Sequence, residues 1–266
     1  MRPADHDAAG FGPYEVARWR AALAHQPWRE VLAHAPTLRR DGRYAAIADP
    51  RAAALLALLD VAPGTRGLIV GDRWGQLAVP LARRAAVTVL GRWPAALALL
   101  HAIGVQEGVD LAVCAGRLAD APLAAARFDL VLLHAGLGDA ATDRGPMALA
   151  AAARLLAPGG MLVLATPNDA PAATDGEAAP LEANTVQADT PQADTRNDLT
   201  QWHAAFAAAG LTAAAVYACF PDHQAPSHLV ALPLLADFLA GWDAPDVART
   251  TRPPGYAFFL RAGATP

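Results

Sequence analysis

The stretch most suited to chemistry runs from residue 66 to 84 and reads RGLIVGDRWGQLAVPLARR. A short apolar run leads into Gly71 and Gly75, and a segment with helical spacing follows. A strand, a glycine turn and a helix in this order can hold a nucleotide-like cofactor, because glycine lets the backbone approach the ligand. Arg73 and Trp74 stand in this turn, where small residues are expected. The stretch therefore predicts a cofactor-type junction with an unusual lining.

Arginines follow three of the predicted strands, at Arg73, Arg92 and Arg117. The carboxyl ends of parallel strands share one edge of a sheet, so these side chains would converge on one cleft. With backbone N–H groups at the helix that starts near Gly75, they would hold a phosphate or another anion. One hypothesis is therefore an anionic small-molecule ligand, such as a nucleotide sugar. The alternative is that the three arginines point into solvent.

His134 ends the apolar run FDLVLLH and is the candidate catalytic residue, as a general base toward a substrate hydroxyl. The alternative is a histidine whose hydrogen bonds are satisfied at the end of a strand. Cys114 and Cys219 lie far apart, and neither they nor the histidines show metal-ligand spacing. We expect no metal and two reduced thiols, which is typical of a cytoplasmic protein.

The composition limits the classes of function. The chain has 266 residues, of which 54% are hydrophobic and 17% charged, with a formal net charge of -4. These values predict a globular protein, and every basic side chain other than histidine is arginine. No cluster of basic residues indicates nucleic-acid binding, and no apolar run is long enough to predict a membrane span.

The elements that must position these residues alternate between strands and helices from about residue 50 onward. Fully apolar runs predict strands buried on both faces of a mostly parallel sheet. Seven strands are predicted at 67–70, 87–90, 111–114, 128–134, 161–165, 211–220 and 255–263. Helices are predicted at 75–84, 94–103, 146–157 and 229–240, with Pro-Gly-Gly (158–160) ending the third. This order predicts a Rossmann-like, doubly wound α/β fold.

Two further segments frame this domain. Residues 15–40 predict two short helices within an N-terminal helical extension, 1–48, and residues 49–266 form the α/β domain. A low-complexity stretch, 169–198, is short of bulky apolar residues and interrupts the domain as a flexible insert. It is either an active-site lid or a tolerated surface insertion.

The order of elements from about Pro50 onward resembles the class I S-adenosylmethionine-dependent methyltransferases. LIVGDRWG lies where that family has its first glycine motif, and VTVLGRWP where its second strand ends. ALAAAARLLAPGGMLVLATPN is the most specific match, with a helix, Pro-Gly-Gly and the fifth strand. FPDHQAP, at 220–226, resembles a turn of one bacterial subgroup that accompanies glycosyltransferases in surface-polysaccharide assembly, although His223 replaces the tyrosine of that turn.

The resemblance implies S-adenosylmethionine as the cofactor and assigns its site. Gly71 and Gly75 match the outer glycines of the first motif, and Arg73 replaces the middle one. Three family acids are also replaced, at Ile69 before the motif, at Gly91 after strand two and at Arg117 after strand three. The predicted cofactor-binding set is Gly71, Arg73, Gly75, Gly91, Arg92, Trp93, Gly116 and Arg117.

These replacements all weaken a site for this cofactor. Loss of the carboxylate partner of the ribose hydroxyls reduces the binding free energy of the cofactor by about 1–3 kcal/mol. Nearby arginines also repel the positively charged sulfonium of S-adenosylmethionine. We therefore expect weak or absent cofactor binding, and three functions stay open. The first is a pseudoenzyme that acts through a protein partner, either an active enzyme or a second copy. The second is an active methyltransferase on a small molecule or glycan, with Trp93 stacked on adenine. The third is the anion binder described above.

Overall fold

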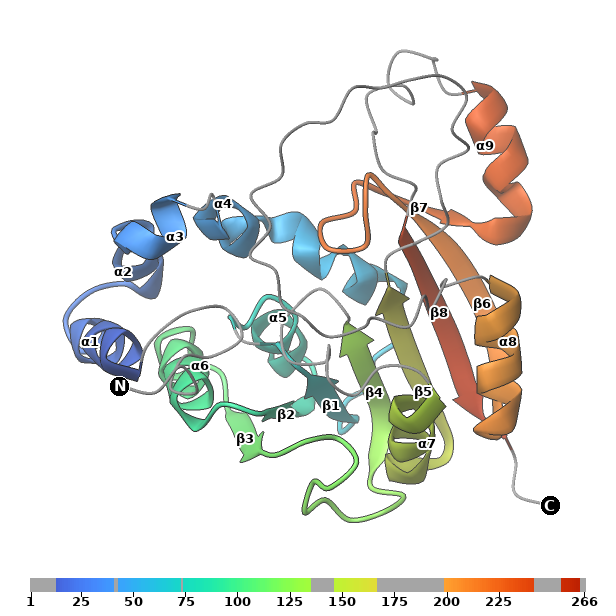
Figure 1. Cartoon of the computed structure of the whole chain (residues 1–266), viewed down its shortest axis with the longest axis horizontal. Coiled ribbons are helices and arrows are strands. Elements are labelled where there is room, and N and C mark those ends of the chain that lie inside the picture. The colour runs from blue at the N-terminus through green and yellow to red at the C-terminus, as the bar shows by residue number, and fades with distance from the viewer. Residues whose placement is uncertain are drawn as a thin grey trace, which may run out of the picture.

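The computed structural model describes residues 13–40, 43–72, 74–134, 146–166, 199–241 and 255–263. They form one eight-stranded sheet in the order β3-β2-β1-β4-β5-β8-β6-β7 (Figure 1). The strands are β1 (Arg66–Val70), β2 (Ala86–Gly91), β3 (Leu111–Ala115), β4 (Phe128–His134), β5 (Leu156–Thr166), β6 (Leu211–Phe220), β7 (His228–Ala231) and β8 (Gly255–Ala262). Neighbours among the first five strands pair in parallel, whereas β8 is antiparallel to β5 and β6, and β7 is antiparallel to β6. The predicted Rossmann-like α/β fold is confirmed.

Successive residues of each central strand bury opposite faces of the sheet. In β1, Leu68 and Val70 belong to one buried cluster and Ile69 to the other. The face with Leu68 packs against α7 (Pro146–Leu155) and α8 (Leu199–Ala208). The face with Ile69 packs against the remaining central helices, which are η2 (Pro50–Leu58), α5 (Ala78–Ala82) and α6 (Pro94–Gln106). Two covered faces explain why the strand sequences are continuously apolar.

The N-terminal segment packs on the Ile69 face through α1 (Pro13–Leu23), α2 (Trp28–Ala33), α3 (Pro36–Arg40) and α4 (Arg43–Ala48). Residues 15–40 were predicted to form two helices, and the structure has three there because Pro36 starts a further short helix after His34. Helix α1 lies against α6, and Figure 1 shows α1–α4 beside α5 and α6. Among the described residues, no helix combines the length and apolar character that crossing a bilayer would require.

The end of α6 fastens this N-terminal segment. Gln106 accepts a hydrogen bond from the Trp28 backbone N–H at 2.8 Å and donates to the Leu23 carbonyl at 2.6 Å. Glu107 accepts from the Trp28 indole at 2.6 Å and from the Arg29 guanidinium at 2.7 Å. The link between α1 and α2 is therefore bound by polar contacts as well as by apolar packing.

An eighth strand replaces part of a predicted helix. The sequence predicted a helix over 229–240, but β7 precedes a short 3₁₀ turn, η4 (Leu232–Leu234), and helix α9 begins only at Leu235 and ends at Gly241. Val230 is buried with Ala218 and Phe220. Pairing with β6 provides partners for the backbone of 228–231, which outweighs the local helical pattern.

The Pro-Gly-Gly sequence lies inside β5 rather than after α7. Phe128 pairs with Leu156 and Leu130 pairs with Met161, so residues 157–160 form a bulge against one residue of β4. Gly159 has a φ of +72°, and a Cβ on Gly160 would lie 2.8 Å from the Ala157 carbonyl oxygen. The prediction that this turn ends the helix at residue 157 was therefore wrong, and α7 ends at Leu155.

Candidate functional site: the edge where β1, β2 and β4 end

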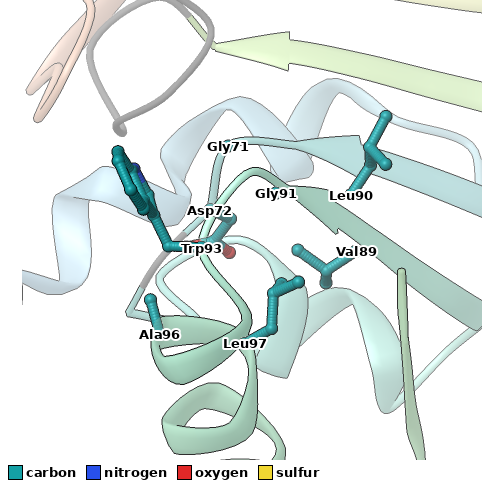
Figure 2. A pocket seen from close by; sticks show the side chains of 8 residues that line it. All are labelled: Gly71, Asp72, Val89, Leu90, Gly91, Trp93, Ala96 and Leu97. Atoms are coloured by element: carbon teal, nitrogen blue, oxygen red, sulfur yellow. The ribbon is translucent and has the colours of Figure 1, made fainter. Parts of the chain in front are cut away.

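The carboxyl ends of β1 and β2 enclose a small hollow (Figure 2). Its lining consists of Gly71, Asp72, Val89, Leu90, Gly91, Trp93, Ala96 and Leu97. The hollow has a free volume of about 10 Å³, which is the space of one water molecule. Three residues of the predicted cofactor set, Gly71, Gly91 and Trp93, therefore lie together around this hollow.

Asp72 follows the turn at Gly71, whose φ of +84° is in the region that favours glycine. Its side chain is 1% exposed, and its carboxylate accepts four backbone hydrogen bonds from the residues that lead into α5. Oδ1 accepts from Gly75 at 2.9 Å and Gln76 at 3.1 Å, and Oδ2 from Leu77 at 2.9 Å and Ala78 at 2.6 Å. These contacts hold the turn that leads into α5 and reach the first helical residue, Ala78.

The cap has two chemical consequences. A carboxylate has about four acceptor positions, so Asp72 has none left for ribose hydroxyls. The same contacts also occupy the N–H groups of Gly75 and Gln76. The prediction that amides at the helix near Gly75 help to hold an external anion is therefore wrong, because the chain supplies its own anion there.

Burial and hydrogen bonding act on Asp72 in opposite directions. Desolvation is the largest effect and raises the pKa of the carboxyl, while the four amide donors oppose that rise. Four N–H donors suit the ionised form, because a protonated oxygen would present its own hydrogen to one of them. Asp72 thus serves the fold of the turn.

Gly91, at the position that the resemblance assigns to a ribose-binding acid, is packed against Leu97. Gly91 ends β2, and a Cβ built on it would lie 3.2 Å from Leu97 Cδ2. Leu97 is 5% exposed and comes from the first turns of α6. A longer side chain at residue 91 would therefore have to displace Leu97. The replacement of the acid by glycine is matched by an apolar side chain packed over it.

Two other family positions also serve packing. Gly75 has a φ of +78°, and a Cβ there would lie 2.8 Å from Val79 Cγ2 and 3.0 Å from Leu100 Cδ1. This glycine allows α5 and α6 to approach each other closely. Ile69 is fully buried in the apolar cluster on the face of β1 that packs against η2, α5 and α6. A carboxylate at this position would therefore be buried among apolar side chains.

The predicted arginine cluster is only partly visible. Arg73 lies outside the described residues, and so does the predicted insert at 169–198. Arg92 and Arg117 are exposed, and neither lines the hollow. The Arg92 guanidinium lies 5.8 Å from the Trp93 ring centre. Gly116 follows β3 and donates its N–H to the Gly91 carbonyl at 2.9 Å, which continues the sheet ladder.

His134 lies at the same sheet edge. Val70 pairs with Leu133, so the next residues of these neighbouring strands are Gly71 and His134. His134 is 1% exposed, and its Nε2 contacts the His223 carbonyl oxygen at 2.9 Å. A carbonyl only accepts, so Nε2 carries the hydrogen. Burial, and then repulsion by His223, lowers the pKa of His134 to about 3.

These features describe a packed histidine more closely than an accessible base. A general base must reach the proton that it removes, and His134 is enclosed. Among the described residues, no group of three or more histidine, cysteine, aspartate or glutamate side chains is arranged to hold a metal ion.

The fold and the strand order define a protein with a Rossmann-like, methyltransferase-type sheet. The family model described as a methyltransferase domain matches residues 68–164. This part of the chain, from β1 to β5, is therefore similar to a methyltransferase domain, and the sheet order gives it a Rossmann-like fold. A comparison with curated proteins found no match.

Solved structures with this fold resemble the chain at low identity. The [4+2]-cyclase SpnF is 16% identical with a TM-score of 0.57, and the match covers 98% of this chain and 97% of that one. A SAM-dependent methyltransferase from Aquifex aeolicus is 11% identical with a TM-score of 0.51, covering 95% and 99%. The N-methyltransferase NodS from Bradyrhizobium japonicum is 18% identical with a TM-score of 0.50, covering 80% and 94%. At these identities the likeness establishes the fold, which does not by itself determine the reaction.

Sequence reasoning missed three features of this edge. Asp72 lies between the two glycines of the turn, and its spacing before a predicted helix start was a usable signal for a capping role. Leu97 gave no signal, because an apolar residue in an apolar helix looks like any core residue. The stacking of His223 on His134, at 5.3 Å between ring centres, joins residues 89 positions apart.

Proposed function

We propose that this protein is a non-catalytic member of the methyltransferase superfamily that acts through a protein partner. The observation that carries the proposal is the filled cofactor edge, where Asp72 caps the turn and Leu97 packs over Gly91. The hollow among the described residues has space for about one water molecule, and its lining carboxylate, Asp72, has no free acceptor for ribose hydroxyls. Both observations support weak binding of S-adenosylmethionine.

The contrast between fold and ligand positions supports this function. Residues that pack the sheet and its helices keep the family pattern, including Gly75 and the Pro-Gly-Gly bulge. Positions that would serve only a ligand differ from the family pattern. Gly91, packed against Leu97, and the exposed Arg117 both stand where the family has an acid. A protein that needs its shape but not its cofactor would combine these two features. The partner would be an active enzyme or a second copy of this chain.

Calorimetric titration with S-adenosylmethionine and S-adenosylhomocysteine tests the proposal. We expect no heat of binding for the native protein at about 100 μM ligand. This result would exclude a dissociation constant of about 100 μM or lower. The double variant Gly91→Asp, Leu97→Ala restores an acid and clears the space above it. Two ribose hydrogen bonds to a carboxylate contribute about 1.5–3 kcal/mol each, so this variant should gain at least tenfold in affinity.

Matched variants separate the two effects. Leu97→Ala alone opens space without an acid, and Leu99→Ala removes an equal volume from α6 at a residue that does not line the hollow. Neither should bind as tightly as the double variant. Micromolar binding by the native protein, or methyl transfer to any acceptor, would refute the non-catalytic function. Capture of partners from native extract then identifies the protein on which it acts.

The second candidate is an active methyltransferase with an unusual pocket. Trp93 favours it, because this side chain lines the hollow and immediately precedes α6 (Figure 2). An indole face offers stacking to adenine, which does not depend on an acid. Trp93→Ala distinguishes the two candidates. It should abolish any cofactor binding that the native protein has, and it should leave partner capture unchanged if the protein is a scaffold.

A further inference from the structure

We propose that His134 and His223, named here the histidine clasp, form an acid-operated latch that holds the loop 221–227 over the carboxyl end of β4. The proposal is independent of whether the protein binds a cofactor. It begins with a feature that neither the fold nor the proposed function requires, a pair of buried histidines, 1% and 5% exposed.

The two rings contact each other directly. Their centres lie 5.3 Å apart with an angle of 28° between the planes, which is a stacked arrangement. The His134 Nε2–H donates to the His223 carbonyl at 2.9 Å, so the loop is bound through both its ring and its backbone. The remaining nitrogen, Nδ1 of His134, is buried and has no hydrogen-bond partner among the residues that the structure describes.

The loop is braced internally, so it can move as a unit. Asp222 Oδ1 accepts from the Gln224 N–H at 2.8 Å and the Ala225 N–H at 3.0 Å. The Ser227 N–H donates to the Phe220 carbonyl at 2.7 Å and closes the base of the loop. These bonds do not depend on the histidines, and they would persist after the loop leaves β4.

His223 is also the point at which the loop meets β8. A Cβ on Gly255 would lie 2.7 Å from His223 Cβ and 2.8 Å from its backbone nitrogen. The backbone of His223 therefore packs directly against Gly255, and any side chain at residue 255 would prevent this close approach. Release of His223 from His134 would free this contact as well.

The charges around the clasp favour one direction of response. Asp222 lies on the loop and is the acid whose charge acts on His134, and it also acts on Arg51 of η2. On β6 the nearby thiol of Cys219 is buried. On β1 the acid is Asp72, whose carboxylate is taken up by the amides of α5, and the β5 neighbour of His134 is Ala165.

Acid acts on this arrangement through the free Nδ1. A proton placed there creates a buried imidazolium stacked on a second imidazole, and the cost of burying this charge outweighs what the backbone of His134 itself offers the new N–H. Opening of the loop lets water solvate the cation. Protonation therefore favours the open loop, and the closed loop favours the neutral ring, as linkage requires. The expected result is a loop that closes at neutral pH and opens as the pH falls.

Amide hydrogen exchange of the native protein tests the latch. After correction for the intrinsic pH dependence of exchange, peptides that cover 221–228 should open about tenfold more per pH unit below about pH 6.5. The central strands β1 and β4 should keep their protection over the same range. His134→Gln places its amide N–H near the position of the histidine Nε2 and can donate to the His223 carbonyl, but it does not titrate, so its opening should not vary with pH by more than about twofold.

Two controls keep the test decisive. His203→Gln changes an exposed histidine on α8 and should behave like the native protein. If His134→Gln does not fold, ring ¹⁵N spectra of the native protein report whether His134 stays in the Nε2–H form until the loop opens. The proposal is overturned if the loop opens equally at all pH values, if His134→Gln keeps the native pH dependence, or if the whole chain opens with the same slope.

Discussion

Asp72 provides a sharp test of how the glycine turn is held. The substitution Asp72→Asn keeps the size of the side chain but replaces one acceptor oxygen with an N–H donor. Two of the four backbone N–H groups then lose their partner, either those of Gly75 and Gln76 or those of Leu77 and Ala78. The amide should turn its nitrogen toward Gly75 and Gln76, because the Gln76 contact is only partly buried and water can replace it.

The magnitude follows from these contacts. One fully buried N–H without a partner costs about 1–3 kcal/mol. The two remaining hydrogen bonds lose the assistance of a charge, which removes about another 1 kcal/mol each, and the lower desolvation cost of an amide offsets part of this. The net loss should be about 2–4 kcal/mol of unfolding free energy, a large share of the stability of a domain.

Urea unfolding at neutral pH, followed by far-UV circular dichroism, measures this loss, and an unchanged m-value confirms that the unfolding transition is the same. Asp129→Asn is the matched control. This exposed carboxylate pairs with Arg66 at 2.8 Å and should contribute less than about 1 kcal/mol. A loss below about 0.5 kcal/mol for Asp72→Asn would refute the reasoning, since a carboxyl that is already neutral would tolerate an amide.

Two further predictions concern packing and charge. Gly75→Ala should lower the free energy of unfolding by about 2–4 kcal/mol in the same assay, because its φ of +78° is strained for alanine and its Cβ would overlap Val79. Gly108→Ala is the control, since Gly108 has a similar φ of +69° but open space around it, and it should cost only about 1 kcal/mol. Glu107 accepts from Trp28, Arg29 and Arg83, and these contacts, the Trp28 hydrogen bond first, lower its pKa. A lowered carboxyl pKa gives stability that is present above about pH 4.5 and lost as the pH falls through the folded value, so the difference between the native protein and Glu107→Gln should shrink in acid. A difference that grows in acid in pH-dependent unfolding curves would contradict this assignment.

Local and periodic patterns in the sequence alone predicted seven of the eight strands and their doubly wound α/β arrangement. The apolar runs at β1, β2, β4 and β5 are buried on both faces, and that property is readable because each residue of such a strand needs an apolar side chain. The family's glycine turn and Pro-Gly-Gly sequence were readable for a similar reason, since their backbone conformations restrict the residue type. The placement of Gly71 and Gly91 at one sheet edge followed from the strand order.

Contacts between distant segments decided the rest. Strand β7 replaced a predicted helix because β6 offered it hydrogen-bond partners, and the bulge at 157–160 arose from the register of β5 against β4. The sequence alone showed an acid next to a glycine turn, but not that four amides take up its carboxylate. It showed Gly91 in place of an acid, but not that Leu97 lies over it. It showed His134 at a strand end, but not that His223 stacks on it. Sequence patterns record the local backbone and burial demands of each residue, whereas the contacts of Asp72, Gly91 and His134 depend on which distant groups the fold brings into one small volume.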